Sequence, residues 1–370
     1  MSDRRVPFLD LRPADSPDLD ATLTAIRRVL ERGWLILGPE VEAFEREFAE
    51  VSGVAHAVGV GNGTDALFLL LTALGIGRGD EVITTPVSAA FTALAIVMTG
   101  ARPVFADVDP GRLTIDPAAV AAAIGPRTAA ILPVHLYGQP ADMLPLAAIA
   151  ERHNLALIED CCQAHLATCG GQPVGTFGAG GAFSFYPTKN LGAAGDAGAV
   201  CTGDAALAER VRRLRHGGQA ARFEHQLAGV NSRLDEVQAA ILRLRLPALR
   251  DATDRRRALA ARYRTALAAT SVAVPPERDP GHVYHLFPVR LAERDRLRAH
   301  LDAAGIETLI HYPTPLPEQP TFAEQDPASC PTANIVCAEV LSLPLHPRLP
   351  DRAVTTVANA VRSFPDRSPG

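Results

Sequence analysis

Short apolar runs alternate with helix-like segments over the first two thirds of this chain, and this alternation limits its fold more than any other feature. Runs typical of buried strands lie at residues 81–85, 103–107, 128–134, 156–159, 182–185 and 198–201. Helical patterns lie between them, at residues 90–98, 117–123, 143–153 and 205–214. Strands separated by helices predict an α/β domain with a mostly parallel sheet flanked by helices.

The pattern changes near residue 245. A capping-box-like start at Ser232 predicts a helix that Pro247 interrupts, and a second helix reaches about residue 268. The remaining chain predicts a strand at 283–289, helices at 294–304 and 351–364, and a proline-rich loop at 312–320. A chain of 370 residues is long for one core. We therefore expect a large domain over residues 1–245 and a smaller α+β domain over residues 246–370.

The composition excludes several classes of function. A net charge of −5 lacks the basic excess of a nucleic-acid-binding protein. The longest apolar stretches fall short of the roughly 18–20 residues that span a membrane, and the first residues contain no signal-peptide core. The six cysteines form no CxxC pair and no zinc spacing, so they predict reduced thiols, a cytoplasmic protein and no metal site.

Lysine occurs only once, at Lys189, while the other 35 of the 36 basic residues are arginines. Arginine evidently serves wherever a surface cation is needed. An amine that must lose its proton or form a Schiff base cannot be replaced by a guanidinium, which stays charged. Codon bias is the alternative explanation, and the surroundings of the lysine decide between the two.

Three segments place polar groups at predicted strand ends, where open α/β sheets bind ligands. Gly61-Asn62-Gly63-Thr64-Asp65 opens a helix, and its glycines and free N–H groups suit a phosphate, although glycine also serves tight turns. Glu159 and Asp160 end a strand and should point to opposite faces. One acid can enter a cleft while the other faces solvent or a helix end.

The third segment, SFYPTKN, carries Ser184 and Lys189 in a glycine-rich loop after a strand. A Walker-type site is excluded because Asn190 follows the lysine, and neither GxSxG nor HExxH occurs. Cys161, Cys162 and His165 are better explained as fillers of small buried spaces than as metal ligands. A phosphate cradle, a strand-end acid and one lysine together predict a pyridoxal phosphate (PLP) site, with the lysine joined to the cofactor aldehyde and the acid paired with the ring nitrogen.

Four segments then point to a known family: GNGTDAL, EDCCQAH, SFYPTKNLGAAGDAG and GVNSRLDEVQAAIL. In order and spacing, over about residues 6–350, they resemble the fold type I nucleotide-sugar aminotransferases of the DegT family. The resemblance implies a fold type I PLP-dependent transferase. It also implies a homodimer with shared active sites.

The resemblance further implies roles for individual residues. Lys189 matches the catalytic lysine that carries PLP and moves the proton, and Asp160 matches the partner of the ring nitrogen. Gln163 matches the residue near the 3-hydroxyl of the cofactor. The phosphate contacts match Gly63, Thr64 and Ser184, together with Asn231, which reaches the phosphate of the neighbouring subunit.

Substrate contacts are expected at Phe91, Arg233, His311 and Tyr312, although Arg233 equally fits a surface ion pair. The family usually stacks an aromatic side chain on the cofactor ring, near Ala89 and Ala90 of this chain. Phe91 stands one or two residues later, and between stacking from a shifted position and a place in the helix core we favour the core.

The resemblance implies amino transfer, with glutamate as donor, to a keto sugar of a nucleoside diphosphate in amino-sugar or antibiotic biosynthesis. The NSRLDE segment favours amination at C3 of the sugar over C4. Amination of a cyclitol or another ketone is a related alternative. A non-catalytic, PLP-binding regulatory protein is the alternative from a different class.

Overall fold

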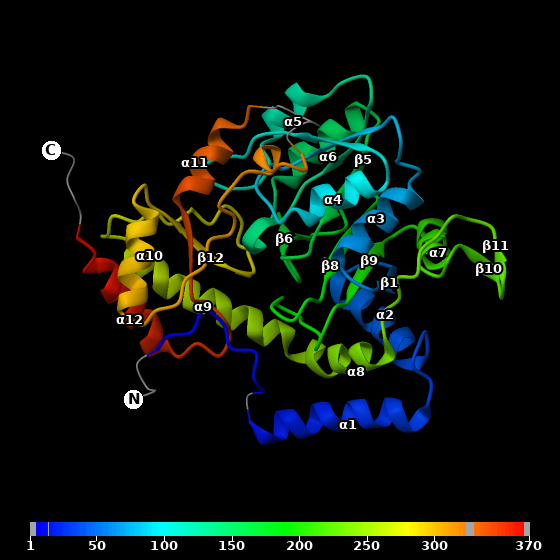
Figure 1. Ribbon diagram of the computed structural model, residues 1–370, viewed down its shortest axis with the longest axis horizontal. Helices are drawn as coiled ribbons and strands as arrows, with labels where there is room; N and C mark the ends of the chain where they lie inside the picture. The colour runs from blue at the N-terminus through cyan, green and yellow to red at the C-terminus, as the bar shows by residue number, and fades with distance from the viewer. Residues whose placement is uncertain (1–4, 14, 323–328, 366–370) are drawn as a thin grey trace.

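The computed structural model describes residues 5–13, 15–322 and 329–365, and it is built on a seven-stranded sheet (Figure 1). The strand order is β1-β9-β8-β5-β4-β2-β3. The strands are β1 (His56–Val60), β2 (Glu81–Thr84), β3 (Arg102–Phe105), β4 (Thr128–Leu132), β5 (Ala156–Asp160), β8 (Gly180–Ser184) and β9 (Gly198–Thr202). Within this sheet β9 runs antiparallel to both neighbours, and the pairings from β8 to β3 are parallel, which confirms the mostly parallel α/β fold.

Helices cover both faces of this sheet because its strands are apolar on both sides. Side chains such as Ile158 pack on one face against α3 (Gly63–Ala73), α4 (Phe91–Met98) and α7 (Ala205–Leu214). Residues such as Leu157 point to the other face, towards α5 (Pro117–Ala123) and α6 (Met143–Arg152). The same face is covered nearer β9 by α2 (Pro39–Ser52) and α8 (Glu236–Arg245), with α1 (Ser16–Arg32) packed outside α8.

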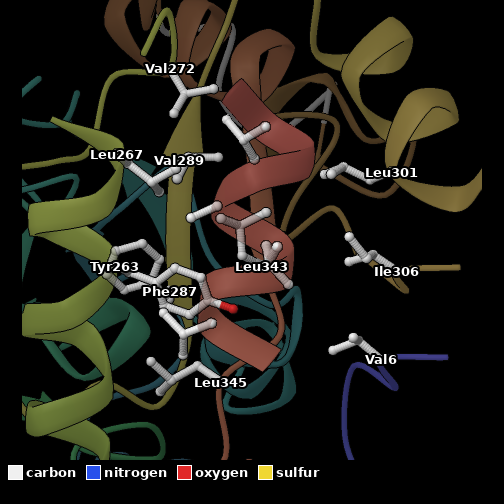
Figure 2. Close-up of a cluster of buried hydrophobic side chains, with 14 of the residues drawn as sticks. Val6, Tyr263, Leu267, Val272, Phe287, Val289, Leu301, Ile306, Leu343 and Leu345 are labelled. Carbon is white, nitrogen blue, oxygen red and sulfur yellow. The ribbon is translucent and has the colours of Figure 1, made fainter. Parts of the chain in front are cut away.

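A second apolar core lies in the C-terminal part of the chain (Figure 2). It joins the long helix α9 (Leu249–Leu267) to the antiparallel pair β12 (Phe287–Arg290) and β13 (Val340–Leu343), with α10 (Arg294–Ala303) and α12 (Asp351–Arg362) beside them. Helix α11 (Pro331–Glu339) packs in a neighbouring cluster. The buried side chain of Val6 also belongs to this core, and its N–H donates to the carbonyl of Gly305 at 2.9 Å. The domain boundary at residue 245 stays a prediction.

Several smaller elements complete the fold. They are the 3-10 turns Leu136–Gly138, Leu246–Ala248 and Leu316–Glu318, and the short strand pairs β6 (Thr168–Cys169) with β7 (Gln172–Pro173) and β10 (Gln219–Ala221) with β11 (Glu224–His225). No helix of the described residues is both long and apolar enough to cross a membrane.

Several elements differ from the sequence predictions: α1, α11 and β13 were not expected, and the strand expected at 283–289 is β12. Two further differences lie beside the glycine turn. Strand β1 was not expected, since Gly59 interrupts its apolar run; a Cβ there would lie 2.9 Å from the Leu234 side chain, so close packing requires the glycine. The helix expected from Ser232 begins only at Glu236. The Ser232 hydroxyl does not cap it, because it accepts the N–H of Gly61 at 2.9 Å and donates to Asp65 at 2.6 Å.

Candidate active site

Three loops meet at the carboxyl edge of the sheet, around Gly63. These loops follow β1, β5 and β8. A Cβ on Gly63 would lie 2.7 Å from the Cβ of Ser184 and 2.8 Å from the Sγ of Cys162. The structure therefore brings together the glycine turn, the acid-containing segment and the start of the lysine loop, as the sequence predicted.

The glycine turn leaves N–H groups at the start of α3. Asn62 is the N-cap, and its side chain accepts the N–H of Asp65 at 2.9 Å. The N–H groups of Gly63 and Thr64 come earlier in the first turn, where no acceptor exists within the helix. Together with the positive end of the helix dipole they suit a phosphate, and the Ser184 side chain lies against Gly63 beside them.

Asp160 ends β5 and is 4% exposed. One carboxylate oxygen accepts the hydroxyl of Thr92 at 2.8 Å, and the other accepts the N–H of Cys162 at 3.0 Å. Thr92 also lies 3.2 Å from the hydroxyl of Ser88. Sequence reasoning missed Thr92, because only the packing of α4 against β5 brings its hydroxyl to the acid.

Glu159 points to the opposite face, as the alternation of the strand predicted, but it is fully buried. The expectation that the second acid faces solvent or a helix end is wrong. Its oxygens accept the N–H groups of Gly175 and Phe177, each at 2.8 Å, and lie 3.1 Å from Nε2 of His135. The loop after β7 thus encloses the carboxylate with donors of its own.

His135, Glu159 and Cys161 form a cluster with the spacing of metal ligands. Hydrogen bonds account for it. Nδ1 of His135 accepts the N–H of Ala141 at 3.0 Å, so Nε2 carries the hydrogen that is donated to Glu159. The cluster therefore stabilises the fold at the end of β5.

Lys189 follows β8 in a turn in which its N–H donates to the carbonyl of Tyr186 at 2.8 Å. The side chain is half-buried, and no hydrogen bond or ion pair holds its amine within the described chain. Burial lowers the pKa of Lys189, while the nearby Cys162 and Asp160 act in the opposite direction. The lone lysine thus presents an amine that loses its proton more readily than usual, next to the strand-end acid.

Gln163 is held in one orientation beside these groups. Its Oε1 accepts the N–H of Tyr137 at 2.8 Å, and its Nε2 donates to the hydroxyl of Tyr312 at 3.3 Å. The hydroxyl of Tyr137 in turn donates to the carbonyl of His311. Two residues expected to contact substrate, His311 and Tyr312, therefore lie next to a residue expected to contact the cofactor.

The other expected substrate contacts lie elsewhere. Phe91 is 61% exposed, so our prediction that it belongs to the helix core is wrong. Ala89, two residues earlier, is half-buried. Arg233 is hydrogen-bonded to Nδ1 of His216 at 3.2 Å, with no carboxylate partner in the described chain, and Asn231 is exposed.

The donor set fits the functional groups of pyridoxal phosphate. Helix N–H groups and a hydroxyl suit its phosphate, a buried carboxylate suits its ring nitrogen, and an amine with a lowered pKa suits its aldehyde. Gly63 supports this fit independently, because any side chain there would close the cradle between Ser184 and Cys162.

Known proteins resemble this chain over most of its length. Residues 18–362 match the DegT/DnrJ/EryC1/StrS aminotransferase family. The chain belongs to this family. It is 49% identical to dTDP-3-amino-3,4,6-trideoxy-alpha-D-glucose transaminase of Streptomyces venezuelae, over 98% of this chain and 97% of that protein.

Solved structures of family members share the fold. The crystal structure of S. venezuelae DesV in complex with a ketimine intermediate has a TM-score of 0.94 at 49% identity, covering 98% of this chain and 99% of that one. NtdA from Bacillus subtilis, with bound cofactor PMP, has a TM-score of 0.90 at 30% identity, covering 98% and 86%. The family depends on PLP, so this chain is a PLP-dependent aminotransferase of fold type I.

Proposed function

We propose that this DegT-family aminotransferase moves an amino group from glutamate to C3 of a keto sugar attached to a nucleoside diphosphate. The single lysine carries the proposal, because its amine has a lowered pKa and lies beside Asp160 and the Gly63 cradle. The 49% identical relative is a transaminase named for a 3-amino sugar of dTDP, which supports the substrate class and the position.

Each residue of this site has a separate role in such a reaction. Bound PLP supplies an aldehyde that takes up the amino group and a ring that withdraws electrons from the neighbouring carbon. The N–H groups of Gly63 and Thr64, with the hydroxyl of Ser184, bind the phosphate. Asp160 accepts the hydrogen of the ring nitrogen, and Thr92 orients that carboxylate.

Lys189 would anchor the cofactor through its side-chain amine, and the same amine, once released, would accept the proton that the reaction moves and return it. Its lowered pKa leaves more of the amine unprotonated near neutral pH, which a general base requires. Gln163 orients the cofactor hydroxyl, since its own amide is fixed by Tyr137 and Tyr312. His311 and Tyr312 contact the sugar next to the cofactor. Arg233 and Phe91 contact the substrate nearer the protein surface.

The active site of this proposal is shared between two copies of the chain. The family resemblance assigns Asn231 to the phosphate of the neighbouring subunit, and its exposure supports contact with a second copy. Exposed apolar side chains on and after α1, among them Leu19, Leu23, Leu30 and Trp34, support a partner surface. A cytoplasmic homodimer is therefore part of the proposal. Mixing Asn231→Ala with Lys189→Ala subunits should restore activity in the heterodimers, and no recovery would argue against sharing.

Covalent attachment is the first test. Borohydride reduction of the purified protein followed by peptide mapping should place PLP on Lys189. An unlabelled lysine would overturn the proposal. Adding glutamate should then change the visible absorption of the bound cofactor, whereas an unchanged spectrum would favour the non-catalytic regulatory alternative.

The acceptor is tested by product mass. A panel of 3-keto and 4-keto sugars of dTDP and UDP, with a keto cyclitol as comparison, should give an amino product only from a 3-keto nucleotide sugar. Preferred amination of the cyclitol would support the related alternative instead.

A further inference from the structure

Tyr137 contacts the cofactor side and the substrate side of the candidate site through two separate groups. It lies in the 3-10 turn Leu136–Gly138, in the loop after β4, and is 1% exposed. Its N–H donates to Oε1 of Gln163 at 2.8 Å, and its hydroxyl donates to the carbonyl of His311. Tyr137 therefore joins a residue expected to contact the cofactor to a segment expected to contact the substrate.

The backbone of Tyr137 has a conformation that is unfavourable for a residue with a side chain. Its φ is 60° and its ψ is 4°, in the left-handed region where the Cβ crowds a carbonyl group. The surroundings hold this conformation, because the carbonyl of Tyr137 also accepts the N–H of Leu286 at 3.2 Å, so that all three polar groups of the residue have partners. Glycine would be unstrained here, and a large side chain kept at a strained position indicates that the side chain has a role.

Three hydrogen bonds fix the segment of His311 and Tyr312, and two of them come from Tyr137 and its partner Gln163. The carbonyl of His311 accepts the Tyr137 hydroxyl, and Nδ1 of the same histidine lies 3.0 Å from the hydroxyl of Ser342. The hydroxyl of Tyr312 accepts from Nε2 of Gln163 at 3.3 Å, and its own hydrogen has no acceptor among the described residues. Burial raises the pKa of Tyr312 to about 12, so this hydroxyl keeps its hydrogen at neutral pH and can donate it to a ligand.

We propose that Tyr137 is a positioning residue, which orients the segment of His311 and Tyr312 relative to Gln163 so that the Tyr312 hydroxyl donates to an oxygen of the keto sugar. This proposal rests on the proposed function, which places His311 and Tyr312 at the sugar. Tyr137 is buried and its hydroxyl is already used, so it acts on the reaction only through these neighbours. The alternative is a residue that only stabilises the fold, and the experiment below separates the two.

Tyr137→Phe removes the hydroxyl and keeps the N–H that donates to Gln163. The PLP-loaded variant is assayed with the nucleotide-linked keto sugar that the wild-type protein aminates. The KM for this sugar should rise about fivefold, the effect of losing one hydrogen bond, while the single-turnover reaction of the bound cofactor with glutamate should stay within about twofold.

Tyr263→Phe is the matched control. Tyr263 is fully buried in the C-terminal core, and its hydroxyl donates to the carbonyl of Pro344 at 2.9 Å. Each variant loses one buried hydrogen bond from tyrosine to a carbonyl, so both should lose similar stability in denaturant unfolding. Only Tyr137→Phe should change the KM for the keto sugar.

A double variant tests whether the effect passes through Tyr312. Tyr312→Phe alone should raise the KM for the keto sugar, and adding Tyr137→Phe should raise it by less than about twofold more, because the hydroxyl to be positioned is gone. An unchanged KM in Tyr137→Phe, the same change in Tyr263→Phe, or the full fivefold effect in the Tyr312→Phe background would each contradict the positioning role. Failure of the proposed function would instead appear in the wild-type protein, as an unlabelled Lys189 or as no amino product from any keto sugar.

Discussion

The two sides of β5 differ, at its carboxyl end, in how completely their polar groups are satisfied. Around Glu159, both carboxylate oxygens and both nitrogens of His135 have partners within the protein. Around Asp160, the carboxylate is held by Thr92 and Cys162, but the amine of Lys189 and the first N–H groups of α3 have no acceptor among the described residues. The two adjacent acids therefore have different roles. The side of Glu159, where every polar group has a partner, stabilises the fold, and the side of Asp160, where some polar groups have none, binds a ligand.

Lys189→Arg tests the unsaturated side most severely. The charge and much of the volume remain, but a guanidinium neither bonds to the cofactor aldehyde nor releases a proton. Transamination should fall by more than about 10³-fold. The melting temperature, followed by circular dichroism, should stay within about 2 °C. Retained activity would show that another group acts as the base.

The paired variants Asp160→Asn and Glu159→Gln compare the two sides directly. Asp160→Asn should lower turnover by about 10²-fold, because the charge facing the ring nitrogen is lost, with little change in stability. Glu159→Gln should cost about 2–4 kcal/mol of unfolding free energy, since its amide N–H₂ would face a buried N–H donor. Denaturant unfolding and turnover per folded molecule separate these effects, and the opposite distribution would contradict the comparison.

The buried ring of His165, close to β5, makes the stability of the protein depend on pH. It lies among Phe48, Phe183 and Phe185, and burial lowers its pKa to about 3. Below about pH 6.5 the unfolded chain binds a proton at this histidine that the folded chain does not, so stability falls as the pH falls, by about 2 kcal/mol at pH 5. In His165→Leu the pH dependence between 7 and 5 should become shallower by this amount. An unchanged slope would show that the buried ring accepts a proton.

Thr92 carries the smallest expected effect. Thr92→Val keeps the shape but removes the hydroxyl that donates to Asp160, for a cost of about 1 kcal/mol or about fivefold in turnover. Thr92→Ser restores the donor and should recover the activity. The pH titration of the cofactor absorption should shift in the valine variant alone. Equal behaviour of both variants would mean that Thr92 only fills space.

The sequence predicts the helices and strands whose positions follow from the hydrophobic pattern of neighbouring residues. Strands β2, β3, β4, β5, β8 and β9 follow apolar runs, and α5 and α7 begin and end where the pattern predicts. The lone lysine and the glycine turn are equally local, so the cofactor side of the sheet could be found without a structure.

The remaining features depend on contacts between distant residues. Thr92 meets Asp160 across 68 positions, and Glu159 finds donors 16 to 24 positions away. Phe91 is apolar and helical, but it lies on the face of α4 that is left uncovered in the described chain. No periodicity contains such information, because it arises only when the elements pack.

The N-terminal segment has a consequence for how the protein is made. Phe8 donates its N–H to Glu307, 299 positions later, and Val6 bridges to Ile306. Val6 and Phe8 therefore gain these partners only after about 300 further residues have been synthesised, while the central sheet can assemble without them. Closure of this contact is a late event in biosynthesis, and a bulky fusion ahead of Val6 should slow the last stage of maturation more than the earlier ones.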